Sequence, residues 1–288
     1  MPDRDPFAPV ILTAADGARA EVLPHGAHVV SWRPAPDAPG GSDERLYLSA
    51  RAERRPGAAV RGGVPVCWPQ FADAGPLAKH GFARTRPWAA GEAGTDAAGT
   101  AFAQFTLADD AETRAAWPHA FRLALTVRVA AGWMEVALAV ENPGDAPFAF
   151  TGALHTYLAV GDVEAARLRG LEGARYRDKT LEKAGGGADQ PPSPDALAPA
   201  GEVDRVYAGK AAPVELVDPT LGRRLRLSQG GFPDVVVWTP GEASGSAMGD
   251  AAPGDWRRFL CVEAAAAAGP VTVAPGARWA GGQRLEAA

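Results

Sequence analysis

The residues of this sequence best suited to proton transfer are a histidine and a glutamate in two apolar segments far apart in the chain. The histidine, His155, stands in FAFTGALHTYLAV (148–160). If this segment is extended, His155 and Tyr157 share a face with small residues, and the large apolar side chains point to the other face. Such a face leaves room above a sheet for a ligand. A single histidine in this setting is also typical of a hydrogen-bonded core residue.

The glutamate, Glu263, stands in RRFLCVEAAAAAG (257–269). In a strand it shares a face with Phe259, Cys261 and Ala265. An ionised carboxylate in so apolar a run is costly to bury unless it is partnered or its pKa shifts, which makes it a candidate for a functional site. A charge at a strand end or a structural ion pair would explain the same position. The alanine-rich tail could also begin a helix, which would change the face that Glu263 occupies.

Cationic side chains gather in RGGVPVCWPQFADAGPLAKHGFARTRPW (61–88). Arg61 precedes two glycines, at which the backbone can bend or approach a ligand closely, and Arg84 follows His80. Guanidinium groups match phosphate and carboxylate oxygens in a bidentate geometry, and Lys79 could add a third cation. Any one of these charges could instead be solvated at the surface. Together they indicate a polar site with acid, base and anion-binding groups, without identifying the substrate.

The elements that must position these residues are predicted to be short β-strands. Residues 121–129 and 134–140 alternate apolar with polar or small side chains, which predicts two half-buried strands in an antiparallel hairpin. Shorter strands are predicted at 27–32, 214–217, 224–227, 234–238 and 271–273. The 34 glycines and 26 prolines favour many turns over long helices. This spacing predicts an all-β fold, a large antiparallel β-sandwich.

The low-complexity stretch AGGGADQPPSPDALAPAG (184–201) has the composition of an interdomain linker. We expect a long surface loop instead, within a single domain that spans residues 1–288. The reason is that the candidate residues lie on both sides of this stretch and must meet in one site.

Composition narrows the class of protein further. Apolar residues make up 47% of the chain, which is enough to fill a globular core. Cys67 and Cys261 stand in apolar runs, which favours buried reduced thiols over a disulfide. We expect neither a secretory signal nor a membrane span, and the net charge of −5 without a basic block argues against nucleic acid as a partner. A cytoplasmic protein is expected. The oligomeric state stays open, with a monomer slightly favoured.

Five segments resemble, in the same order, those of the hexose-6-phosphate mutarotases, or glucose-6-phosphate 1-epimerases, of the galactose-mutarotase-like superfamily. They are RGGVPVCWPQF, HGFAR with the following PW, ALHTYL, GEVDRVY, and CVEAA with the terminal APGARWAGGQRL. A single piece such as HGFAR is weak evidence, whereas five in register over nearly the whole chain are specific. The resemblance implies a galactose-mutarotase-like supersandwich, with no metal and no organic cofactor. It also implies an isomerase that interconverts the α and β anomers of a hexose 6-phosphate, above all glucose 6-phosphate.

The resemblance implies roles for individual residues as well. In the implied mechanism, ionised Glu263 is the general base that takes the proton of the anomeric hydroxyl, and protonated His155 is the general acid that donates to the ring oxygen. The ring opens, and closure after a bond rotation gives the other anomer. The substrate-binding residues would be Arg61, Lys79, His80, Arg84 and Asp204. Of these, the two arginines and the lysine would hold the 6-phosphate, and His80 and Asp204 would contact the sugar hydroxyls or the ring oxygen.

The sequence departs from the family pattern at one place. Where relatives often have Trp-Asn-Pro-Trp, this chain has Trp238-Thr239-Pro240-Gly241, which bears on the identity of the substrate more than on the type of reaction. Two other functions therefore stay open. One is an aldose 1-epimerase for unphosphorylated sugars, and the other is a carbohydrate-binding or sensing module without catalysis. A glycoside hydrolase is disfavoured, because that chemistry normally uses two carboxylates.

Overall fold

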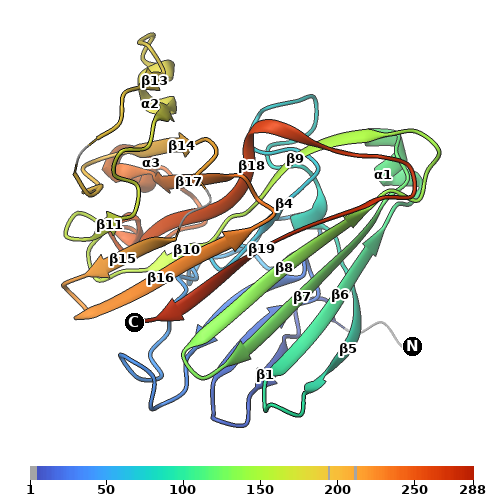
Figure 1. Cartoon of the computed structure of the whole chain (residues 1–288), viewed down its shortest axis with the longest axis horizontal. Coiled ribbons are helices and arrows are strands. Elements are labelled where there is room, and N and C mark those ends of the chain that lie inside the picture. The colour runs from blue at the N-terminus through green and yellow to red at the C-terminus, as the bar shows by residue number, and fades with distance from the viewer. Residues whose placement is uncertain (1–4, 194, 211–212) are drawn as a thin grey trace.

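The computed structural model describes residues 5–193, 195–210 and 213–288, which form three antiparallel sheets (Figure 1). The smallest sheet contains β1 (Val10–Thr13), β2 (Arg19–Leu23) and β3 (His28–Arg33). The other two have eight strands each. We call them the long sheet and the site sheet, and they pack against each other as a sandwich.

The long sheet supplies one side of the core. Its strands, in spatial order, are β11 (Arg167–Arg169), β15 (Val214–Asp218), β16 (Arg223–Gly230), β19 (Arg278–Ala287), β8 (Trp133–Glu141), β7 (Arg122–Ala130), β6 (Ala101–Ala108) and β5 (Ala89–Thr95). In Figure 1 the strands β5 to β8 and β19 run diagonally across the right of the view. Buried and more exposed residues alternate along most of β6 and β7, because one face of each strand meets the core and the other meets solvent.

The site sheet carries the candidate residues. Its strands, in spatial order, are β13 (Asp189–Gln190), β12 (Tyr176–Asp178), β14 (Val203–Tyr207), β17 (Asp234–Thr239), β18 (Phe259–Val273), β9 (Phe148–Leu154) and β4 (Val66–Cys67), and β10 (Tyr157–Ala159) also pairs with β18. The first eight residues of β18 are all buried. This strand is covered on both faces, by the core on one side and by loops on the other.

Helices are few and short. They are α1 (Ala111–Ala116), α2 (Lys179–Lys183), α3 (Gly241–Ser246) and two 3-10 turns at Ala83–Thr85 and Asp255–Arg257. In Figure 1, α2 and β13 project from the upper left of the sandwich. No helix in the described ranges is long and apolar enough to cross a membrane.

The main hydrophobic core lies between the two large sheets. Trp68 and Phe150 enter it from the site sheet and its edge, and Leu125 and Leu285 enter it from the long sheet, all of them buried. Burying a side chain of this size contributes about 1.5–3 kcal/mol relative to leaving it exposed. The cysteines, Cys67 and Cys261, are buried and free, as the sequence predicted.

The fold confirms the predicted β-sandwich and most of its strands. The expected hairpin is β7 and β8, and the runs at 27–32, 214–217, 224–227 and 234–238 lie in β3, β15, β16 and β17. The run 271–273 is the end of β18 and not a separate strand, and the alanine-rich tail is also strand, so the alternative of a helix there is wrong. The pairing of β18 with β9 shifts register between Ala266 and Val271.

The stretch 184–201 is only partly a surface loop. Its described residues include β13, which pairs with β12, and the buried Leu197, which exchanges backbone hydrogen bonds with Leu168 at 2.9 Å each. Burial of one apolar side chain thus fixes a segment that composition alone describes as flexible. That residues 1–288 make a single domain stays a prediction.

Candidate active site

A pocket of about 290 Å³ lies on the face of the site sheet opposite the main core. Val262 and Ala264 of β18 join that core, so the residue between them, Glu263, points to the other face. The structure brings together in this pocket every residue that the sequence analysis selected. They are His155, Glu263, Arg61, Lys79, His80, Arg84 and Asp204. Their individual roles stay predictions.

His155 and Glu263 face each other across the gap between β9 and β10. The ladder with β18 has the same register on both sides of this gap, which places the two residues opposite each other. His155 Nε2 lies 3.4 Å from Glu263 Oε1, and the side chains are 8% and 1% exposed. Among the described residues, neither His155 Nδ1 nor Glu263 Oε2 has a hydrogen-bond partner. Both of these atoms are fully buried.

Burial opposes charge on both members of this pair. It raises the pKa of Glu263 well above its usual range, and the carboxylate of Asp204 adds to the effect. It lowers the pKa of His155 well below its usual range, and the cations Arg84 and Arg61 add to that effect. Burial therefore favours the uncharged form of both groups, a protonated glutamate next to a neutral imidazole.

This uncharged pair differs from the charge distribution that the resemblance implied, an ionised glutamate beside a protonated histidine. The two arrangements hold the same number of protons. They differ by one proton transfer between atoms that lie 3.4 Å apart. A bound substrate that bridges or polarises the pair can convert one into the other.

Tyr157 orders the floor of the pocket. Its ring stacks on the imidazole of His155, with the ring centroids 4.9 Å apart and the planes at 14°. Its hydroxyl accepts a hydrogen bond of 2.8 Å from Arg61 Nη1, while Arg61 Nε donates to both oxygens of Asp250 at 3.1 and 3.2 Å. The charge of Arg61 is thus compensated by Asp250. Arg61 is therefore less suited to bind a phosphate than the sequence predicted. It instead holds Tyr157, whose ring stacks on His155.

His80 is held in one tautomer by its neighbour Ala72. The backbone N–H of His80 donates to Ala72 O at 2.9 Å, and the ring Nδ1 of His80 accepts from the backbone N–H of Ala72 at 3.2 Å. Because Nδ1 is the acceptor and burial lowers the pKa of His80, the neutral ring carries its proton on Nε2 and can donate it to a ligand oxygen. The turn needs Gly81, since a Cβ there would lie 2.3 Å from Trp68 O.

Three cations of the pocket have no carboxylate partner in the part of the chain that the structure describes. They are Lys79, Arg84 and Lys179. Arg84 Nη2 donates to Lys79 O at 3.0 Å, and Arg84 Nε is buried without a partner. The ammonium group of Lys179 lies 5.2 Å from the centroid of the Phe71 ring. These three charges are available to an anionic group of a ligand.

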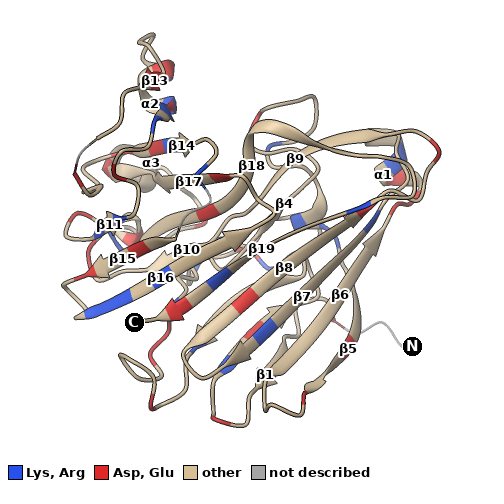
Figure 2. Ribbon diagram, viewed as in Figure 1, with Lys and Arg blue, Asp and Glu red and all other residues tan. Residues whose placement is uncertain are grey.

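Asp204 shares the pocket with the helix α2. Lys183 Nζ lies 3.6 Å from Asp204 and 3.3 Å from Glu202, and Figure 2 shows basic segments of α2 close to acidic segments around β14. Burial raises the pKa of Asp204, although Lys179 and Lys183 act in the opposite direction. Because residues four apart lie on one helix face, α2 presents both of its lysines to the pocket.

The departure from the family pattern is accommodated by a short helix. Trp238 and Pro240 line the pocket, and Gly241 begins α3 with a φ of +64°. A Cβ at Gly241 would lie 2.5 Å from Glu202 N, so a tryptophan there would require the backbone to move. Met248, which follows α3, contributes a pocket wall.

Two features of the site escaped sequence reasoning. Lys179 and Lys183 lie in a segment without a periodic pattern, and the only local signal is Asp178, a residue type common at helix N-caps, just before them. The other is Phe71, which shares an apolar cluster with Ala153 on the face of β9 that small residues were expected to leave open, and which lines the pocket. The ligand space lies beside this cluster, above His155.

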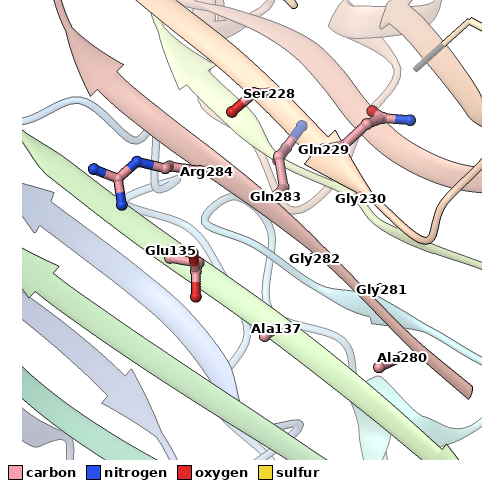
Figure 3. Close-up of a pocket in the computed structure, with 10 residues that line it drawn as sticks. All are labelled: Glu135, Ala137, Ser228, Gln229, Gly230, Ala280, Gly281, Gly282, Gln283 and Arg284. Carbon is pink, nitrogen blue, oxygen red and sulfur yellow. The ribbon is translucent and has the colours of Figure 1, made fainter. Parts of the chain in front are cut away.

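A second hollow, of about 400 Å³, lies over β8, β16 and β19 on the outer face of the long sheet (Figure 3). Its charged lining residues are Glu135 and Arg284, and glycines form much of the rest. It lacks the buried acid and imidazole that proton transfer requires. Within the described ranges no three His, Cys, Asp or Glu side chains are arranged to hold a metal.

Comparison with known proteins assigns the chain to a family. Residues 9–286 match the family described as aldose 1-epimerase. The chain belongs to the aldose 1-epimerase family. It is an isomerase, and a sugar is its class of substrate. A relative from Cenchrus ciliaris, named "Putative glucose-6-phosphate 1-epimerase", is 33% identical over 285 residues, which cover 96% of this chain and 84% of the relative. A relative from Escherichia coli (strain K12), with the same name, is 36% identical over 250 residues, which cover 86% of this chain and 79% of the relative.

A solved structure supports the same assignment. The crystal structure of a "putative mutarotase" from Salmonella typhimurium superimposes with a TM-score of 0.84 at 32% identity, covering 94% of this chain and 87% of the other. The fold of this chain is therefore of the galactose-mutarotase-like type.

Proposed function

We propose that this aldose 1-epimerase family member interconverts the α and β anomers of a hexose 6-phosphate, with glucose 6-phosphate as its substrate. One observation carries the proposal. A single pocket holds a buried histidine–glutamate pair 3.4 Å apart together with Lys79, Arg84 and Lys179, three cations without a carboxylate partner among the described residues. The names of the relatives support the same substrate.

The pair would perform two coupled proton transfers. Ring opening needs a base at the anomeric hydroxyl and an acid at the ring oxygen, and closure needs the reverse. With ionised Glu263 and protonated His155 the pair opens the ring. With protonated Glu263 and neutral His155 it closes the open-chain aldehyde, and this second state is the one that burial favours. Each positioned transfer of this kind contributes about 10²- to 10⁴-fold to the rate.

The phosphate would assist the acid as well as anchor the sugar. Arg84, Arg61 and Lys79 lower the pKa of His155 through their positive charge. A dianionic phosphate beside these cations offsets that charge and makes protonation of the imidazole easier, which is the state that ring opening requires. Binding energy from the phosphate, remote from the reacting carbon, also orients the sugar.

The proposal is tested by dissolving pure α-glucose 6-phosphate and following the appearance of the β anomer by NMR, with and without the protein. Acceleration of glucose 6-phosphate well above glucose and galactose is the expected result. Equal acceleration of the unphosphorylated sugars would make the protein a general aldose 1-epimerase. Tight binding without acceleration would make it a binding or sensing module and refute the proposed reaction.

A further inference from the structure

One backbone hydrogen bond of the site sheet is missing next to His155. Val262 N–H donates to Thr156 O at 3.1 Å, as in a regular antiparallel ladder. The same ladder would have Thr156 N–H donate to Val262 O, but this N–H turns back to Leu154 O at 3.0 Å. The carbonyl of the buried Val262 thereby loses its ladder partner. An unpaired buried carbonyl costs about 1–3 kcal/mol, so a replacement donor is needed.

Gln283 of the long sheet supplies this donor across the core. Its side chain is 2% exposed. Its Nε2 donates to Val262 O at 3.0 Å, and its Oε1 accepts from Thr156 Oγ1 at 2.5 Å. Figure 3 shows Gln283 on β19, which lies between β8 and β16. A single amide therefore ties Thr156, in the gap between β9 and β10, to Val262 of β18, on the face opposite the pocket.

The two residues that Gln283 holds are the chain neighbours of the proton-transfer pair. Thr156 follows His155, and Val262 precedes Glu263. Because the register places Thr156 opposite Val262 and His155 opposite Glu263, the amide fixes the cross-strand pair that lies next to the one in the pocket. We propose that Gln283 is a positioning residue for the reaction, which acts on His155 and Glu263 through Thr156 and Val262. This inference rests on the proposed function.

The consequence of losing the amide follows from the ladder. Without Gln283 Nε2, the buried carbonyl of Val262 is satisfied best by Thr156 N–H, as in a regular strand pair. That change rotates the backbone between His155 and Thr156 and moves the imidazole relative to Glu263. A displacement of about 1 Å at reacting groups can cost about 10²-fold in rate. The cations of the pocket lie on other segments, so substrate binding changes little.

Two variants measure this effect. Gln283→Met keeps the length of the side chain and removes both hydrogen bonds, and we expect kcat for glucose 6-phosphate to fall about 10- to 100-fold with KM nearly unchanged. Thr156→Val removes only the hydroxyl that donates to Gln283, and we expect kcat to fall about 10-fold. Thr156→Ser keeps this hydroxyl and should retain most of the wild-type kcat. If Gln283→Met does not fold, the comparison of Thr156→Val with Thr156→Ser decides the question.

Gln229 offers a matched control. It lies opposite Gln283 on the neighbouring strand, and its Nε2 donates to the carbonyls of Phe232 and Asp234 at 3.0 and 2.8 Å. Gln229→Met thus removes a comparable amide without touching a neighbour of His155 or Glu263. We expect it to lower Tm and to leave kcat within about 2-fold. Equal losses of kcat in both glutamine variants would show a merely structural role and overturn the inference.

The imidazole itself gives a readout that does not depend on activity. An NMR titration of His155 should give a different midpoint in Gln283→Met than in the wild type, because the distance to Glu263 sets the coupling between the two groups. An unchanged midpoint together with a wild-type kcat would overturn the inference. Failure of the wild type itself to accelerate glucose 6-phosphate would instead refute the proposed function, so the two failures are distinguishable.

Discussion

Replacing Glu263 with glutamine keeps the size of the side chain and removes its ability to exchange a proton. Oε1 of Glu263 lies 3.4 Å from His155 Nε2, and the side chain is 1% exposed, so solvent has little access to replace it. We expect kcat to fall about 10²- to 10⁴-fold, the usual contribution of one positioned acid or base. KM should change little, because the phosphate ligands are intact. Exchange NMR on glucose 6-phosphate measures the rate, and calorimetry measures binding.

The same substitution should stabilise the protein in a pH-dependent way. Burial raises the folded-state pKa of Glu263, so the protonated glutamate contributes to the stability of the fold. This contribution is complete below the unfolded pKa of about 4.3, and it is lost as pH rises toward the folded-state pKa. Each pH unit within this window costs the wild type about 1.4 kcal/mol. Glutamine does not ionise, so the variant has no such loss of stability. We therefore expect the Tm of Glu263→Gln to exceed that of the wild type, by a margin that grows between pH 5 and pH 8.

Glu135→Gln is the matched control. Glu135 lies on the outer face of the long sheet, 34% exposed and 3.7 Å from Arg128, so its loss should leave kcat and the pH dependence of Tm unchanged. Two results would refute the reasoning about Glu263. One is wild-type turnover in Glu263→Gln, and the other is a Tm that falls below that of the wild type at pH 8.

Three further predictions concern the anion-binding side of the pocket. Arg84→Ala should raise KM for glucose 6-phosphate about 10-fold or more, since charged hydrogen bonds contribute about 1.5–3 kcal/mol. It should leave the rate with free glucose unchanged, and an equal effect on both sugars would contradict a phosphate role. Lys179→Met should raise the same KM by a factor of about 3 to 10, whereas Lys210→Met, at a half-buried lysine that does not line the pocket, should not, as steady-state kinetics would show. Inorganic phosphate should raise the NMR titration midpoint of His155, because it offsets the cations that lower this pKa, and a midpoint that phosphate does not move would argue against an anion next to Arg84.

The fold could be predicted from the sequence where alternation was clear. The hairpin of β7 and β8 has apolar residues at every second position, and this pattern alone fixed both its strands and its buried face. The alanine-rich part of β18 could not be assigned in the same way, because alanine favours helices and carries no alternation. Pairing with β17 on one side and β9 on the other decides its structure, and those contacts are distant in the sequence.

The site was predictable to the extent that it lies in short motifs. His155, Glu263 and Arg84 stand in segments that resemble a known family, and the structure brings them into one pocket. Lys179 was missed because α2 is a single turn whose place beside the pocket depends on tertiary contacts such as that between Lys183 and Asp204.

The role of Gln283 was equally out of reach of sequence reasoning. Its hydrogen-bond partners lie 127 and 21 residues away in the chain, and no local pattern predicts such a contact. The pKa shifts of the pair were also beyond the sequence, since they follow from the burial of both groups.

The most direct test of the account is two-dimensional exchange NMR on equilibrated glucose 6-phosphate, recorded side by side with the wild type, Glu263→Gln and His155→Asn. We expect cross-peaks between the α and β anomeric protons with the wild type, and none above the spontaneous background with either variant at saturating substrate. Exchange at the wild-type rate in either variant would contradict the claim that this buried pair transfers the protons.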